Sequence, residues 1–136
     1  MAICDREEGM HHLLAEIRAA RHVIDLPRDE ATGRACEQFL DRHADEITAI
    51  VVEPLVQGAG GMLFHEPVVL RRLREAADRH GLLLILDEIF TGFGRTGTLF
   101  ACQQAGIVPD IITLSKALTG GTMALAATVA RRHVYE

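Results

Sequence analysis

The sequence predicts an α/β domain with a mostly parallel sheet and covering helices. Three short apolar runs are typical of buried strands, at residues 47–52, 82–86 and 111–114. Between the first two, residues 67–80 carry apolar side chains at helical spacing. Strand, helix and strand in that order favour a parallel crossover. Because the runs do not alternate with polar residues, we expect both faces of the sheet to be covered.

In the N-terminal third, the sequence pattern predicts two helices and a segment that connects them. Apolar residues recur near helical spacing at 7–20 and again around 31–43. The intervening segment, 21–32, contains Pro27 and is predicted to connect them. The first strand, 47–52, should end at the Glu53-Pro54 step, since proline restricts the residue before it.

The remaining elements follow from helix signals and apolar runs. Pro67 suits the first turn of a helix, and Gly81 is placed to end it in the left-handed conformation. The strand at 82–86 follows directly. Residues 98–105 are expected to form a short helix, and 124–130 a fourth strand.

Composition excludes several classes of function. The 136 residues suit one domain, and 49% apolar with 24% charged residues argues against disorder. Asp and Glu (19) outnumber Lys and Arg (14), and the net charge of −5 argues against a nucleic-acid partner. The longest clean apolar run, Leu82–Leu86, is far too short to span a membrane.

Cysteines and histidines indicate neither disulfides nor a metal. The three cysteines are widely spaced and form no CxxC motif, so we expect a reduced chain in the cytoplasm. The N-terminus turns acidic at once, unlike a signal peptide. None of the seven histidines has the spacing of a helical zinc pair with a third ligand, and no metal site is predicted.

Polar side chains follow three of the predicted strands, and in α/β sheets ligands bind at the carboxyl ends of the strands. They are Glu53, the pair Asp87-Glu88, and Ser115-Lys116. Asp87-Glu88 could be a magnesium-binding pair, but the glycine-rich phosphate loop that this chemistry needs is absent from the sequence. The glycines of residues 92–97 match G-x-G-x-x-G, a weak dinucleotide signal because they do not directly follow a strand.

A third interpretation joins Asp87 to Lys116. A carboxylate at a strand end can hold a pyridine nitrogen protonated, and a lysine amine can form an imine with an aldehyde. Together these groups describe a pyridoxal phosphate site. From spacing alone, a solvated loop residue is the favoured interpretation of Lys116, and Asp87 could equally be a turn or cap residue.

Two longer motifs carry a resemblance to a known family. The run Asp87–Gly97 (DEIFTGFGRTG) resembles the central motif of the class III aminotransferases, and Pro109–Leu118 (PDIITLSKAL) resembles their lysine segment. This implies that residues 1–136 are part of the large domain of a fold-type I pyridoxal-phosphate-dependent transferase, incomplete at both ends. Phe90 stands where a small residue is common among the members that the chain resembles most.

The resemblance also implies a role for individual residues. Lys116 would bind the cofactor covalently, transfer the proton and help to bind substrate, so it is the predicted catalytic residue. Asp87 would pair with the ring nitrogen, and Ile89 would pack on the ring face. Arg95 would help to shape the substrate site, and Glu53 would support the site from behind.

Within the family, Glu53–Met62 and Lys116–Met123 are most similar to the aminotransferases of biotin synthesis. These transfer an amino group from S-adenosylmethionine to 8-amino-7-oxononanoate, and the complete enzyme would be a homodimer. Two alternatives stay open: another class III ω-aminotransferase, or a non-catalytic truncated remnant. We expect the 136 residues alone to be inactive, because the family's phosphate-binding turn and substrate-carboxylate arginine have no counterpart here.

Overall fold

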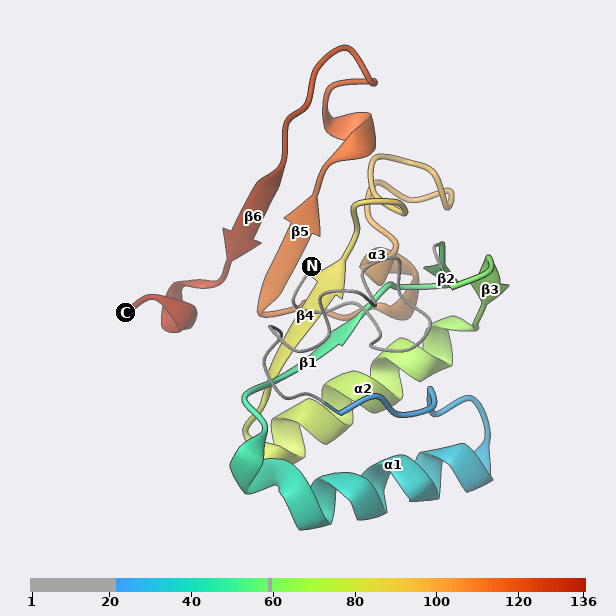
Figure 1. Ribbon diagram of the computed structural model, residues 1–136, viewed down its shortest axis with the longest axis vertical. Helices are drawn as coiled ribbons and strands as arrows, with labels where there is room; N and C mark the ends of the chain where they lie inside the picture. Colours follow the sequence, from blue (N-terminus) through green and yellow to red (C-terminus); the bar gives the residue numbers. More distant parts are fainter. Residues whose placement is uncertain (1–21, 59) are drawn as a thin grey trace, which may run out of the picture.

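The computed structural model describes residues 22–58 and 60–136 (Figure 1). The helix predicted at 7–20 therefore lies outside the described residues. The helical elements are α1 (Glu30–His43), η2 (Ala44–Glu46), α2 (Pro67–His80), α3 (Cys102–Ala105), η3 (Lys116–Leu118) and η4 (Arg132–Val134). The strands are β1 (Ala49–Val52), β2 (Val56–Gln57), β3 (Leu63–Phe64), β4 (Leu83–Asp87), β5 (Ile111–Leu114) and β6 (Ala127–Ala130).

Four strands form one sheet in the order β1-β4-β5-β6. The β1–β4 and β4–β5 pairs are parallel and the β5–β6 pair is antiparallel, so the predicted mostly parallel α/β sheet is confirmed. Helix α2 provides the crossover from β1 to β4, as the apolar pattern indicated. The small antiparallel hairpin of β2 and β3 was not predicted, because two-residue strands leave no periodic signal.

Local sequence signals explain where the long helices begin and end. Asp29 caps α1 by accepting a hydrogen bond from the Thr32 amide at 2.8 Å, while its own amide donates to the Thr32 hydroxyl. Pro67 opens α2, and Gly81 ends it with φ of 66°, a conformation that glycine adopts without strain. α3 covers only the second half of the predicted 98–105 helix, because residues 98–101 are held in a turn.

The core lies between α2 and the sheet. Leu70 and Leu73 of α2 and Leu84 and Leu86 of β4 are at most 2% exposed. Each such side chain stabilises the fold by about 1.5–3 kcal/mol through removal of apolar surface from water. The alternate β4 residue Ile85 is half-buried, so among the described residues the helices cover one face of the sheet more fully than the other. The expectation of two fully covered faces is therefore not met by these residues.

A cluster of ion pairs around Asp110 lies at the amino end of the sheet. The buried Asp110 carboxylate accepts hydrogen bonds from the Leu84 amide at 2.8 Å and from Arg74 Nη1 at 2.7 Å. Its other oxygen lies 3.0 Å from His133 Nε2 and 3.6 Å from Arg131 Nη1. Burial would raise the pKa of Asp110, but the Leu84 amide and the Arg74 guanidinium outweigh it and hold the pKa below its usual value. In the part of the chain that the structure describes, no helix is long and apolar enough to cross a membrane.

Candidate functional site

Asp87 and the segment that carries Lys116 lie at the same carboxyl edge of the sheet. Asp87 is the last residue of β4, and its partner across the β4–β5 pair is Thr113. Lys116 follows Thr113 by three residues and opens η3. Because β4 and β5 are parallel neighbours, Asp87 and the segment that carries Lys116 come to the same edge, and parallel strands lie only about 4.8 Å apart.

The Asp87 carboxylate retains capacity to accept hydrogen bonds. Its side chain is half-buried, and its Oδ1 atom accepts a hydrogen bond from the Ile89 amide at 3.0 Å. Among the described residues no other donor reaches this carboxylate. The Ile89 amide thus fixes the orientation of the carboxylate and leaves Oδ2 able to accept from a ligand.

Lys116 sits in an unusual backbone conformation. Its φ is 41°, in the left-handed region, which costs a residue other than glycine about 1–3 kcal/mol. The preceding Ser115 supports this turn by donating from its hydroxyl to the Leu125 carbonyl at 2.8 Å. Lys116 is also the only lysine in the sequence, since the other 13 of the 14 basic residues are arginines.

The Phe90 ring makes cation–π contacts with both Lys116 and Arg95. Lys116 Nζ lies 5.0 Å from the centre of the Phe90 ring, and Arg95 Cζ lies 4.9 Å from it. Arg95 is further held by a 2.5 Å hydrogen bond from its Nε to the Phe90 carbonyl oxygen. Cation–π contacts at exposed sites are worth about 0.5–1 kcal/mol each. Phe90 therefore orients both Lys116 and Arg95, a role that the sequence did not reveal.

Glu53 supports this arrangement from the end of β1. Its Oε2 accepts a hydrogen bond from the Gly58 amide at 2.9 Å, and its carbonyl oxygen lies 3.1 Å from His65 Nε2. A β-carbon at Gly58 would lie 3.4 Å from both the Glu53 carboxylate and the Phe90 ring. Glu53 thus holds the loop that packs beside Phe90.

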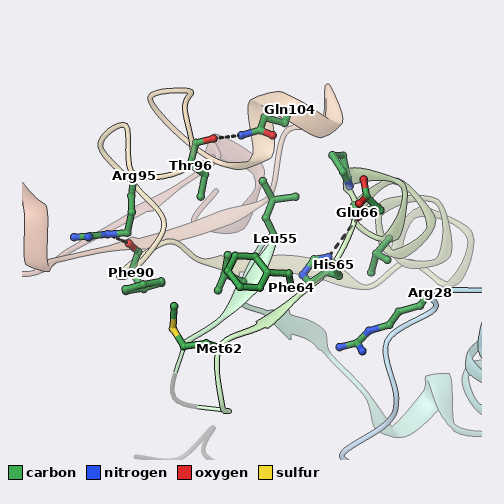
Figure 2. Close-up of a pocket in the computed structure, with 13 residues that line it drawn as sticks. Arg28, Leu55, Met62, Phe64, His65, Glu66, Phe90, Arg95, Thr96 and Gln104 are labelled. Atoms are coloured by element: carbon green, nitrogen blue, oxygen red, sulfur yellow. Dashed lines mark hydrogen bonds between the residues drawn. The ribbon is translucent and has the colours of Figure 1, made fainter.

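A cavity of about 660 Å³ adjoins Phe90 and Arg95 (Figure 2). The β2–β3 hairpin, the start of α2 and the loop after β4 supply most of its walls, with Leu55, Phe64 and His65 projecting into it. Asp87 and Lys116 do not line the cavity. Because the Phe90 ring borders it and also carries the Lys116 contact, Phe90 separates the cavity from the carboxyl-edge pair.

Glu88 has a structural role that the sequence did not predict. It is fully buried, and its two oxygens accept hydrogen bonds from the amides of Ala101 and Cys102 at 2.8 and 2.9 Å. The Thr91 hydroxyl adds a third bond at 3.1 Å. These contacts fasten both ends of the 89–101 loop to β4. They also engage both Glu88 oxygens, so the pair Asp87-Glu88 does not present two free carboxylates to a magnesium ion.

The glycine-rich loop lacks the geometry of a dinucleotide site. Residues 89–101 form successive turns, and the Gly97 amide donates to the Gly94 carbonyl at 3.1 Å. The next helix, α3, begins only at Cys102. A dinucleotide fingerprint would instead open a helix at its glycines, so this alternative loses its support.

The described cysteines are free and buried. Burial, followed by the negative charge of Glu88, raises the pKa of the Cys102 thiol to about 11. Burial likewise raises the pKa of Cys36. Because the thiolate is the nucleophilic form, neither group has the character of a reactive cysteine.

Comparison with known proteins identifies the family of the chain. The sequence profile of the aminotransferase class-III family matches residues 1–136. The adenosylmethionine-8-amino-7-oxononanoate aminotransferase of Mycobacterium leprae is 53% identical over 133 residues, which cover 95% of this chain and 30% of that protein. The chain thus spans about a third of the length of that curated relative.

Solved structures show the same fold. An (S)-enantioselective ω-transaminase from Thermomicrobium roseum superposes with a TM-score of 0.72 at 38% identity, covering 76% of this chain and 23% of that one. The ornithine aminotransferase of Toxoplasma gondii, whose active site holds PLP at partial occupancy, gives a TM-score of 0.69 at 37% identity, covering 75% of this chain and 23% of that one. The fold, the profile and the relatives place the chain in the class III aminotransferase family.

Proposed function

We propose that this chain forms the cofactor-binding part of a pyridoxal-phosphate-dependent aminotransferase. The observation that carries the proposal is the register of β4 and β5, which brings Asp87 and the Lys116 turn to one edge of the sheet. The family match over residues 1–136 supports it independently.

The residues at this edge fit the cofactor. Pyridoxal phosphate has an aldehyde that reacts with a primary amine and a ring nitrogen that accepts a proton. Lys116 offers the amine, and no carboxylate of the described residues pairs with it. Asp87 offers a carboxylate oxygen without a donor, next to the oxygen fixed by the Ile89 amide.

Each residue then has a defined task. When bound, the cofactor supplies an electron-accepting ring that makes a proton on the substrate carbon acidic. Asp87 holds a proton at the ring nitrogen and so favours that acidity. Lys116 binds the cofactor and moves the proton at the substrate carbon. Ile89 would pack on the ring, and Arg95, held by Phe90, would contribute positive charge for the substrate.

We propose S-adenosylmethionine as the amino donor and 8-amino-7-oxononanoate as the acceptor. The support is the 53% identity to the Mycobacterium leprae relative, which is named for both compounds. The product would be 7,8-diaminononanoate. Another class III ω-aminotransferase is the competing proposal, supported by the ω-transaminase of Thermomicrobium roseum at 38% identity. As the family resemblance implies, we also propose that the complete enzyme is a homodimer in the cytoplasm. Sedimentation tests the dimer.

The test measures product formation with the complete gene product. We expect 7,8-diaminononanoate from the two named substrates, detected by mass spectrometry. Lys116→Arg keeps the positive charge over Phe90 but lacks the primary amine that an aldehyde requires, so it should lose all activity and all borohydride-fixed pyridoxyl label. Asp87→Asn should keep the label on Lys116 but slow turnover by about 10²–10³-fold, the usual cost of one electrostatic contact to developing charge.

Three outcomes would contradict the proposal in different ways. Full activity of Lys116→Arg would remove Lys116 from the mechanism. Normal turnover of Asp87→Asn would reduce Asp87 to a turn residue. Turnover of ω-amine donors without any turnover of S-adenosylmethionine and 8-amino-7-oxononanoate would favour the competing aminotransferase. The chain of 136 residues, assayed alone, should form no product, and activity there would show that it needs no further segment.

A further inference from the structure

A second group of ligand-type side chains lies near the amino edge of the sheet. His22, His43 and Glu46 each offer one ligand atom, and these atoms all lie within 4.8 Å of one another. The three residues span 25 positions of the sequence without a metal-binding motif, which is why the sequence predicted no metal. η2 leads directly into the start of β1, so this group is remote from the carboxyl edge.

The local fold explains how the three residues come together. His43 is the last residue of α1, and Ala44 keeps a helical conformation (φ −56°), so the chain continues into η2. This continuation places Glu46 Oε1 3.9 Å from His43 Nδ1. Residues 22–28 run back along α1 from its beginning (Figure 1). His22 therefore reaches the last residue of that helix, His43, with which it makes a ring–ring contact.

Phe39 holds both imidazole rings. Its ring stacks on His43 with 4.7 Å between ring centres, and it meets the edge of His22 at 5.0 Å. The centres of the two imidazoles are 5.3 Å apart. The return segment is anchored as well, because Arg72 Nη1 donates to the Pro27 carbonyl at 2.8 Å. The donors are therefore partly preorganised.

One atom of the group lacks a partner. His43 Nδ1 is buried and makes no hydrogen bond to any described residue, and Glu46 at 3.9 Å is too far to supply one. A buried polar atom without a partner is costly, and a bound cation would provide one.

We propose that His22, His43 and Glu46 bind a divalent transition-metal ion of the Zn²⁺ type. Two imidazole nitrogens and one carboxylate oxygen are a set that zinc uses, whereas Mg²⁺ and Ca²⁺ require oxygen ligands. Zinc bonds to nitrogen of about 2.0–2.1 Å place tetrahedral ligands about 3.4 Å apart. Rotation of the two exposed side chains, His22 and Glu46, can close the present spacing. The ion, with water as a fourth ligand, would fasten the 22–28 segment to the end of α1.

The test titrates the metal-free 136-residue chain with Zn²⁺ against a chromophoric chelator. We expect one equivalent bound, without competition from Mg²⁺. Glu46→Gln removes a ligand from a side chain that is 69% exposed, so it does not endanger folding. It should weaken binding at least tenfold, since loss of even an outer partner of a metal ligand costs about 10–100-fold. His43→Gln should do the same.

Two controls separate this site from other histidines. His80 lies 3.7 Å from Glu37 and 3.6 Å from Asp41, so His80→Gln removes a histidine near carboxylates that is not in the proposed site. The double variant His11→Gln/His12→Gln removes an adjacent pair. Both should leave the zinc affinity unchanged. Zn²⁺ should also raise the thermal midpoint of the wild type and not of Glu46→Gln.

The proposal is overturned by three results. These are no zinc binding, equal affinity in the wild type and in both Glu46→Gln and His43→Gln, or binding that disappears in either control variant. Because the assay contains no pyridoxal phosphate and no substrate, none of these results depends on the aminotransferase activity.

Discussion

Asp87 and Asp110 lie at opposite ends of the same sheet, and their carboxylates have different surroundings. Asp110 is 5% exposed and accepts hydrogen bonds from the Leu84 amide and Arg74, and His133 Nε2 lies 3.0 Å from its other oxygen. Asp87 is half-buried and receives one amide, that of Ile89. A buried carboxylate that accepts hydrogen bonds from the fold and lies among cations stabilises the structure, whereas a half-buried one with an open oxygen can bind a ligand. The difference separates a structural end of the sheet from the end at which we propose that the cofactor binds.

Replacement of Asp110 should give the largest loss of stability. In Asp110→Ala, the buried Leu84 amide loses its acceptor, and Arg74 loses one of its two carboxylate partners while keeping Asp78 at 2.7 Å. Breaking a buried ion pair costs up to about 3–5 kcal/mol. Urea unfolding measures this loss directly. Asp87→Ala is the matched control at the other end, and it should cost less than about 1 kcal/mol, because few contacts are lost. If Asp110→Ala does not fold, the isosteric Asp110→Asn should show a smaller loss of the same sign. Equal losses at the two ends would contradict the comparison.

Glu88 provides a second comparison, because it lies at the carboxyl end of the sheet and both of its oxygens accept hydrogen bonds. Glu88→Gln replaces one acceptor oxygen by a donor that faces the Ala101 or Cys102 amide, and an unsatisfied buried group costs about 1–3 kcal/mol. The 89–101 loop should then become sensitive to limited proteolysis. Glu75→Gln on the exposed side of α2 is the control and should change neither readout. Unchanged proteolysis of Glu88→Gln would show that other contacts hold the loop.

Ionisation of Asp110 should make the stability of the fold depend on pH. Its pKa is lowered from 3.8 in the folded state, so in acid the unfolded state binds more protons and stability falls as the pH drops. The contribution is fully present above about pH 4 and is lost as the pH falls through the lower folded value. The difference in unfolding free energy between the wild type and Asp110→Asn should therefore shrink from pH 5 to pH 2. A difference that stays constant over this range would show that ionisation of Asp110 contributes nothing.

The sequence predicted the elements with strong local signals. The bounds of α2 follow from Pro67 and Gly81, and β5 follows from a short β-branched and apolar run. Asp87 and Lys116 could be paired because motifs fix their distance along the chain and a parallel sheet brings strand ends together. Contacts between distant segments left no such signal. The meeting of Asp110 with Arg74 depends on how α2 packs, and burial of Glu88 depends on where the loop returns.

The same limit applies to Phe90 and to the second histidine group. The identity of Phe90 could be noted as a departure, but its position between Lys116 and Arg95 depends on the turn at 116. His22 and His43 are 21 residues apart, and only the return of the 22–28 segment along α1 joins them. Sequence periodicity describes a residue's own element, and these contacts are made between elements.

The smallest expected effect concerns the Cys102 thiol, which reports on the charge of Glu88. With a pKa of about 11, about one thiol in a thousand is ionised at pH 8, against about one in ten at the ordinary value of 9.0. Iodoacetamide should therefore modify Cys102 about a hundredfold more slowly in the folded chain than in urea, as followed by peptide mass spectrometry. Because burial is the larger cause and Glu88 the second, Glu88→Gln should speed the reaction only severalfold at Cys102. The pKa of the Cys36 thiol is raised by burial and by the charge of Glu37. Its reaction with iodoacetamide should therefore be faster in urea but unchanged by Glu88→Gln. Equal acceleration of both cysteines would mean that Glu88→Gln loosens the whole fold rather than removing a charge beside one thiol.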